Sequence, residues 1–582
     1  MSWCDKLNVK LNNLMEKMLR FIEGSLTITC YLTGVFITGT RVPINFGRMV
    51  VWFSPNLKLS KILIILSLIL AFLYAMMLNI FSRKSVQTPR YNPLYSLITV
   101  LIGLCLYILG IKTLSGVLYL LTVLQLFYAR KKELLLSLAY TYIPLGVLSL
   151  LRWTLFIVNP SRIYSGSFWE LTIVETTLFS ALSLLSPYLL ILNLFLSLLI
   201  FRRSYEKRHL APSRPSHLVD ARKMIILLLL ALTLTSLPYI FSEGTFYGVD
   251  FTAYVIVVKR IFTKNPWGTL YNILRSDRPF FYLVVWFSSN IPGVALENLL
   301  YYMPVALVPL ILISLYYYSS RLFPEISLMA PLIFLLSPTF TVGLYGAFLA
   351  NLLALVLGFI MLLFFEKHFE GHLETLIASL LSLVVYYTHP YTWSVFVVSY
   401  LCKDLIKILL TRKIGFRRKI TFAPLIGIPL VLDALRKVLL GTLTGAEYIA
   451  NVGHKWLSLY KILRLFSNLH FTFYKFGSSF FSNFFIYATS LLGTYYVLRN
   501  IREESLIISA WSVTVLPVIL FGDGQLQARI LLNYPLFIVS ALGLKYFIRK
   551  LSIEKRRIIL MAYLLVNMNY TIRCIANLIL LS

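Results

Sequence analysis

The feature that most constrains this chain is a long series of apolar runs separated by short polar stretches. Many of the runs approach the roughly 20 residues that a helix needs to cross the hydrocarbon core of a bilayer. Backbone groups inside a bilayer must be satisfied within the protein, so we predict that these runs are helices. We predict seventeen spans, at residues 21–40, 61–81, 92–111, 113–129, 134–157, 171–201, 224–241, 296–320, 326–341, 350–365, 373–389, 391–408, 421–439, 478–498, 505–521, 530–547 and 558–580.

The composition excludes an ordinary soluble globular protein. Of the 582 residues, 59% are hydrophobic and only 13% are charged, and the mean hydropathy is +0.80. The fold class that we expect is therefore an all-α polytopic membrane protein. The five cysteines show no CxxC or metal-ligand spacing. The sequence identifies no cofactor and leaves open a divalent cation.

The strongly basic balance, a net charge of +31, follows the predicted topology. Lys and Arg gather in short clusters at residues 130–132, 202–223, 412–419 and 545–557. Alternating the spans from a cytoplasmic N-terminus places all four clusters inside and the C-terminus outside, as the positive-inside rule requires. Because membrane topology explains the charge, we expect a protein of the cell membrane whose partner is the lipid bilayer and not nucleic acid.

One polar stretch divides the chain. Residues 202–223 are basic and hold two prolines, so we predict a cytoplasmic linker there. Residues 1–201 would form an N-terminal multi-span region with an accessory or partner-docking role. Residues 224–582 would form a core of about eleven spans, with a large outer loop between the first two.

That outer loop carries the clearest chemical signal. Asp250 precedes a segment whose apolar residues recur at helical spacing, and Lys259 and Arg260 lie near its far end. A short apolar segment follows Arg278-Pro279, and we interpret the loop as two surface-lying helices. A carboxylate before a helix can cap it, and Asp250 is equally suited to act as a general base at the water boundary.

Several cations and one histidine could bind a phosphate near this acid. Lys259, Arg260 and Arg278 could each contact the phosphate of a lipid-linked substrate or anionic lipid head groups. His389 lies between two predicted spans at an outward end, where it could bind a phosphate or a hydroxyl. Arg529 lies at an outward span entrance, where it could hold a phosphate oxygen or snorkel to the interface.

The order of these motifs resembles the first outer loop of the GT-C superfamily of membrane glycosyltransferases. The resemblance rests on Gly248-Val249-Asp250, on Tyr254, on Trp267 and on the stretch Asp277-Arg278-Pro279-Phe280-Phe281-Tyr282. Protein O-mannosyltransferases and aminoarabinose transferases belong to that superfamily. The resemblance implies a polyprenyl-phosphate or polyprenyl-diphosphate sugar donor and an extracytoplasmic acceptor. It also implies that Asp250 is the catalytic base and that the stretch after Arg278 forms a juxtamembrane helix.

Gln527-Ala528-Arg529 is similar to a late Arg-containing segment of the same superfamily. With Tyr254, Lys259, Arg260, Arg278 and His389, Arg529 completes the expected substrate-binding set. The expected function is a membrane glycosyltransferase. The alternative is a transporter or flippase for a lipid-linked or hydrophilic substrate, although we detect no internal repeat of the kind transporters often show. A structural or interaction protein is a third possibility.

Overall fold

A computed structural model describes most of the chain. It covers residues 3–39, 41–46, 49–53, 57–84, 94–159, 181–207, 221–242, 248, 250–365, 372–411, 416–442, 445, 463–476 and 479–579. The described chain is helical apart from one antiparallel hairpin, β1 (Val42–Phe46) and β2 (Met49–Phe53). The all-α expectation therefore holds with this exception. Most of the predicted linker, residues 208–220, lies outside the described residues.

The described chain forms two compact units, and each is described by itself. The first comprises Met1–Leu184 with Ile548–Arg573. Its helices are α1 (Trp3–Ile37), α2 (Leu57–Lys84), α3 (Leu94–Ile108), α4 (Lys112–Val158) and most of α25 (Ile553–Ile579). Helix α1 packs along α4 and α2. The carboxylate of Glu23 is buried in this packing and accepts hydrogen bonds from the hydroxyls of Tyr74 at 3.0 Å and Ser137 at 2.6 Å.

Helix α4 corrects one predicted boundary. The spans predicted at 113–129 and 134–157 are parts of this one continuous helix, which runs through the basic cluster at 130–132. The predicted separation of these two spans is therefore wrong. Arg and Lys are good helix formers, and neither glycine nor proline is present at the cluster to end the helix. A basic cluster therefore marks a position on a helix as readily as it marks a loop.

The second unit comprises Leu185–Phe547 with Cys574–Ser582, and it contains the predicted outer loop. Its longer helices are α6 (Ser186–Lys207), α7 (Ala221–Phe241), α11 (Leu296–Leu322), α14 (Leu349–Phe365), α15 (His372–Thr388), α16 (Pro390–Thr411), α17 (Phe416–Leu440), α21 (Phe484–Arg499) and α22 (Leu506–Phe521). Shorter pieces are η2 (Pro324–Ile326), α12 (Met329–Leu335), α13 (Pro338–Gly346), α20 (Leu465–His470), η3 (Phe471–Phe476), η4 (Glu503–Ser505), α23 (Gly524–Asn533) and α24 (Leu536–Arg549). Helix α14 packs between α11 and α15, and α16 packs on α22.

Six described helices are long and apolar enough to cross a membrane, and two bent helix pairs raise the number to eight. The remaining predicted spans that the structure describes are mostly shorter apolar helices. The bends occur where a proline starts the second helix or directly precedes it, between α12 and α13 (44°) and between α23 and α24 (57°). A proline cannot continue the preceding hydrogen-bond ladder, which explains breaks inside apolar runs. The protein is a multi-pass membrane protein, and the sidedness of its loops stays a prediction.

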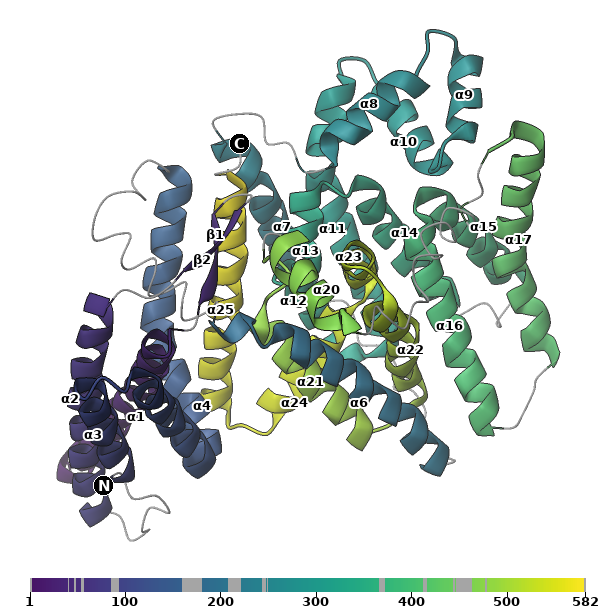
Figure 1. Cartoon of the computed structure of the whole chain (residues 1–582). Helices are drawn as coiled ribbons and strands as arrows, with labels where there is room; N and C mark the ends of the chain where they lie inside the picture. Colours follow the sequence, from purple (N-terminus) through teal and green to yellow (C-terminus); the bar gives the residue numbers. More distant parts are fainter. Residues whose placement is uncertain are drawn as a thin grey trace. The chain divides into compact units, whose positions relative to one another are not determined.

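The predicted outer loop folds into three short helices, not two. They are α8 (Phe251–Ile261), α9 (Pro266–Arg275) and α10 (Pro279–Ser289), which lie together beyond one end of α11 (Figure 1). Pro266 starts the extra helix at a position where its missing N–H costs nothing, and Asn265 caps it by accepting from the N–H of Trp267 at 3.0 Å. The side chains of Trp267 and Phe287 are 78% and 62% exposed, as expected of helices lying at a surface.

Candidate functional site

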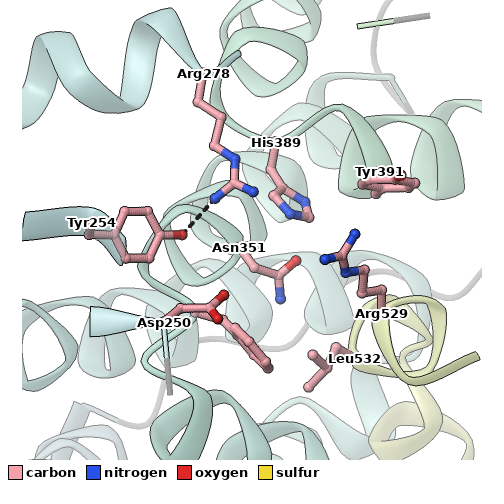
Figure 2. A pocket seen from close by; sticks show the side chains of 9 residues that line it. Asp250, Tyr254, Arg278, Asn351, His389, Tyr391, Arg529 and Leu532 are labelled. Carbon is pink, nitrogen blue, oxygen red and sulfur yellow. Dashed lines mark hydrogen bonds between the residues drawn. The ribbon is translucent and has the colours of Figure 1, made fainter. Parts of the chain in front are cut away.

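A polar pocket lies where the loop helices meet the helix bundle of the second unit. The volume that the centre of a water molecule can occupy there is about 30 Å³, and the pocket is open to solvent on one side. Figure 2 shows side chains from five segments converging on it. The lining residues are Asp250, Tyr254, Arg278, Phe348, Asn351, His389, Tyr391, Arg529 and Leu532. Five of the seven residues predicted for the site are therefore together: Asp250, Tyr254, Arg278, His389 and Arg529.

Asp250 is held in place by its backbone. Its N–H donates to the carbonyl of Gly346, at the end of α13, at 2.9 Å. Gly248 lies so close to Ala347 that a Cβ built on the glycine would be 2.3 Å from the Ala347 Cβ. Only glycine permits this approach, so the short segment ahead of α8 docks tightly against the turn between α13 and α14.

The side chain of Asp250 does not cap α8, although the residue occupies the N-cap position. The capping interpretation of the sequence is therefore wrong. The carboxylate is directed to the pocket (Figure 2), and it makes no hydrogen bond with any residue that the structure describes. Burial raises its pKa above the ordinary value of 3.8, and the positive charges of Arg278 and Arg529 oppose that rise. A carboxylate in this state is a better proton acceptor than an exposed aspartate.

Arg278 reaches the pocket from the junction of α9 and α10. Pro279 follows it, and a residue before proline is disfavoured in the helical conformation, so Arg278 lies outside α10, at its N-cap position, and after the end of α9 at Arg275. Its Nη1 donates to the Tyr254 hydroxyl at 2.7 Å, and the backbone N–H of Ala350 donates to the same hydroxyl at 3.3 Å. Its Nε lies 3.3 Å from a carboxylate oxygen of Asp277. The guanidinium is therefore oriented by a phenol and a half-exposed acid.

A buried ion pair supports the backbone just before Arg278. Arg436 near the end of α17 pairs with Asp433 at 2.8 Å, and their side chains are 7% and 1% exposed. Nη1 of Arg436 also donates to the carbonyls of Leu274 at 3.2 Å and Ser276 at 2.7 Å. The last carbonyls of α9 are thus tied to α17. Sequence reasoning gave this pair no role, because its partners are distant in the chain.

Arg529 enters the pocket from the opposite side on α23. Asp523 caps that helix by accepting from the N–H of Leu526 at 2.8 Å. The Arg529 guanidinium lies over the ring of Tyr391 at 5.8 Å from its centroid, an arrangement that favours the cation and fixes its plane. No acidic side chain among the described residues forms an ion pair with Arg529.

His389 is a buried, uncharged member of the site. It lies between α15 and α16, is 8% exposed, and its Nδ1 is 2.7 Å from the hydroxyl of Thr392. Burial lowers its pKa well below 6.5, and the two arginines of the pocket lower it further. The imidazole can exchange hydrogen bonds with a ligand, but it adds no positive charge at neutral pH.

Lys259 and Arg260 do not reach the pocket. Both lie on the exposed face of α8, toward its far end. Lys259 instead forms a surface ion pair with Glu297 at 2.5 Å, in which both side chains are more than half exposed. Such pairs contribute little to stability.

Four lining residues were not predicted: Phe348, Asn351, Tyr391 and Leu532. A signal existed for Asn351, which is a polar residue inside the apolar run 349–365. A buried amide within such a run needs a hydrogen-bonding partner. The three others are ordinary apolar or aromatic residues and carry no such signal.

No metal site is formed by the residues that the structure describes, since no group of three or more His, Cys, Asp or Glu side chains is close enough to hold an ion. The divalent cation stays an expectation.

No protein-family model matches this chain, and no curated protein is significantly similar to it. The function must therefore be argued from the pocket itself.

Proposed function

We propose that the protein is a membrane glycosyltransferase that moves a sugar from a polyprenyl-phosphate or polyprenyl-diphosphate donor to an extracytoplasmic acceptor. Asp250 takes the proton of an acceptor hydroxyl, whose oxygen forms a bond to the anomeric carbon of the sugar. The bond between that carbon and the phosphate oxygen breaks, and its electron pair leaves with the polyprenyl phosphate. Arg278 and Arg529 bind the departing phosphate.

The observation that carries this proposal is that one acid, Asp250, lines the same pocket as two guanidinium groups, Arg278 and Arg529. The side chain of Asp250 does not cap α8. Arg278 and Arg529 bring two guanidinium groups to the pocket beside Asp250, while Asp277, which does not line the pocket, pairs with Nε of Arg278 at 3.3 Å. A guanidinium can bind two oxygens of a phosphate at once, so two guanidinium groups in one pocket suit a phosphate. Donors that are in place before the leaving group becomes charged stabilise the transition state.

The position of the pocket also suits a donor with a lipid tail. Asp250 follows α7, which is long and apolar enough to span a membrane, and it precedes the three surface helices. The scissile bond of a polyprenyl-linked sugar lies near the head-group plane, since its tail is in lipid and its sugar is in water. A pocket at the end of a span meets such a bond at the right depth.

Asp250→Asn tests the proposal in full-length protein reconstituted with a labelled polyprenyl-phosphate sugar and protein, lipid or glycan acceptors. We expect a loss of transfer of about 10²- to 10⁴-fold, the range for removing a general base, with donor binding retained. Glu297→Gln, which removes an exposed acid of the neighbouring α11, is the matched control and should transfer at the wild-type rate. Wild-type transfer by Asp250→Asn would refute the assignment of the base. Flux of the intact donor across liposomes without sugar transfer would favour a flippase.

A further inference from the structure

One polar group that lines the pocket has no hydrogen-bond partner among the described residues. Asn351 on α14 is 4% exposed and lines the pocket. Its Oδ1 accepts from the hydroxyl of Thr392 at 2.8 Å, whereas its Nδ2 has no hydrogen-bond partner among the described residues. Leaving a buried donor unsatisfied is unfavourable, so such a group calls for an explanation in terms of a ligand.

A neighbouring amide near the same Thr392 hydroxyl shows that a buried asparagine in this position can find a partner for its Nδ2. Asn533 is 2% exposed, and its Oδ1 lies 2.9 Å from the same Thr392 hydroxyl. Its Nδ2, however, donates to the backbone carbonyl of Arg529 at 2.9 Å, so the donor end of this amide has a partner. Asn533 does not line the pocket. Of these two amides, only the one that faces the pocket keeps a donor without a partner.

The surroundings of Asn351 define the chemistry of the missing partner. An amide Nδ2 is a donor only, so the partner must offer an acceptor atom. Figure 2 shows the Asn351 side chain between Asp250 and Arg529, with its nitrogen facing the interior of the pocket. The two guanidinium groups that line the same pocket favour an anionic oxygen.

We propose that Asn351 is a third phosphate-binding residue, whose Nδ2 donates to an oxygen of the phosphate that Arg278 and Arg529 hold. This inference rests on the proposed function and adds to it an uncharged ligand on a different helix. A neutral donor strengthens phosphate binding without a further positive charge beside Asp250, which would weaken that acid as a base. The hydrogen bond from Thr392 positions the amide before the ligand arrives.

Binding measurements on full-length protein in nanodiscs of zwitterionic lipid test the inference. The probes are polyprenyl phosphate, inorganic phosphate and added phosphatidylglycerol, so that a lipid-linked phosphate, a free phosphate and an ordinary anionic lipid are distinguished. We expect Asn351→Ala to weaken binding of polyprenyl phosphate about 10- to 100-fold, the range for one hydrogen bond to a charged group. Asn351→Asp, which keeps the shape but replaces the donor with a negative charge, should weaken it more.

Asn290→Asp is the matched control, because it introduces the same charge at an exposed position at the end of α10 that does not line the pocket. It should bind polyprenyl phosphate as the wild type does. Thermal melting without ligand reports folding, and Asn351→Ala should melt within a few degrees of the wild type, since the one side-chain hydrogen bond between described residues that it removes is that from Thr392 to Oδ1. Asn351→Ser gives a second test if either variant fails to fold.

The outcomes separate this inference from the function on which it rests. Equal binding of polyprenyl phosphate by the wild type and by folded Asn351→Ala would refute the role of Asn351 and leave the proposed function standing. Binding of inorganic phosphate alone, weakened by Asn351→Ala, would support the role of Asn351 and overturn the polyprenyl donor. Equal binding of phosphatidylglycerol and polyprenyl phosphate would assign the site to ordinary lipid head groups. No binding of any phosphate by the wild type would refute both.

Discussion

The substitution Gly248→Ala tests how strictly the position of Asp250 is fixed. A new Cβ would lie 2.3 Å from the Cβ of Ala347 and 2.7 Å from its backbone nitrogen. Carbon atoms in contact are ordinarily about 3.5–4.0 Å apart, so one segment must move by about 1 Å. The flexible end of a side chain cannot relieve this contact, because the opposing atoms are a Cβ and the backbone. The hydrogen bond between the Asp250 N–H and Gly346 lies two residues away and must shift too.

A displacement of about 1 Å in a reacting group can lower a rate about 10²-fold. We therefore expect Gly248→Ala to retain its fold, to bind polyprenyl phosphate nearly as well as the wild type, and to transfer sugar about 10²-fold more slowly. The assay is the transfer assay in reconstituted protein, with thermal melting as a measure of folding. Gly427→Ala is the matched control, since a Cβ there would meet no atom within 4 Å.

A double substitution tests whether the contact with Ala347 causes this loss of rate. Ala347 has a positive φ of 47°, which glycine adopts without strain, so Ala347→Gly alone should be tolerated. Combined with Gly248→Ala, it removes the closest opposing atom and should restore part of the lost rate. Wild-type transfer by Gly248→Ala would refute the claim that this close approach positions Asp250. A slow double variant that is no faster than Gly248→Ala would show that the backbone contact alone decides the effect.

Two further substitutions test the support of Arg278. Tyr254→Phe removes the hydroxyl that accepts a hydrogen bond from Arg278 at 2.7 Å. We expect the variant to bind polyprenyl phosphate about 10-fold more weakly, measured by titration. Its melting temperature, measured by thermal melting, should change little. Arg436→Leu leaves the carboxylate of Asp433 buried without its cation. This should cost about 3 kcal/mol of stability and lower the melting temperature. The control Lys437→Leu, on the exposed side of α17, should leave the melting temperature unchanged.

Local sequence patterns predicted much of the helical fold for physical reasons that act over a few residues. Apolar runs marked α7, α11 and α14 to within a few residues. Where the prediction failed, the secondary structure was decided by tertiary packing or by a run of good helix formers without a helix breaker. The spans predicted on either side of the basic cluster at 130–132 form the single helix α4, because good helix formers continue the helix there. The hairpin of β1 and β2 depends on pairing between strands and had no comparable signal.

The candidate site was predictable in part, because charged residues are conspicuous in an apolar chain. For that reason the sequence predicts four of the site residues, and the structure brings them into one pocket: Asp250, Arg278, His389 and Arg529. The residues that orient them are less visible. Tyr254 was included only as part of a motif, and its contact with Arg278 spans 24 positions of sequence. A pattern on one helix contains no information on which distant side chain will meet it.

The charges of the pocket also predict how donor binding affects the base. Arg278 and Arg529 hold the pKa of Asp250 below the value that burial alone would produce. A bound phosphate neutralises part of this positive charge, so the pKa of Asp250 should rise when the donor is present, and the rate should fall as the pH drops through it. The acidic limb of kcat, which reports the complex, should therefore lie at higher pH than that of kcat/KM, which reports the free enzyme. Coincident limbs in the two pH profiles would show that the phosphate does not reach these arginines, whereas a limb of kcat at lower pH would mean that the donor stabilises the charged carboxylate instead.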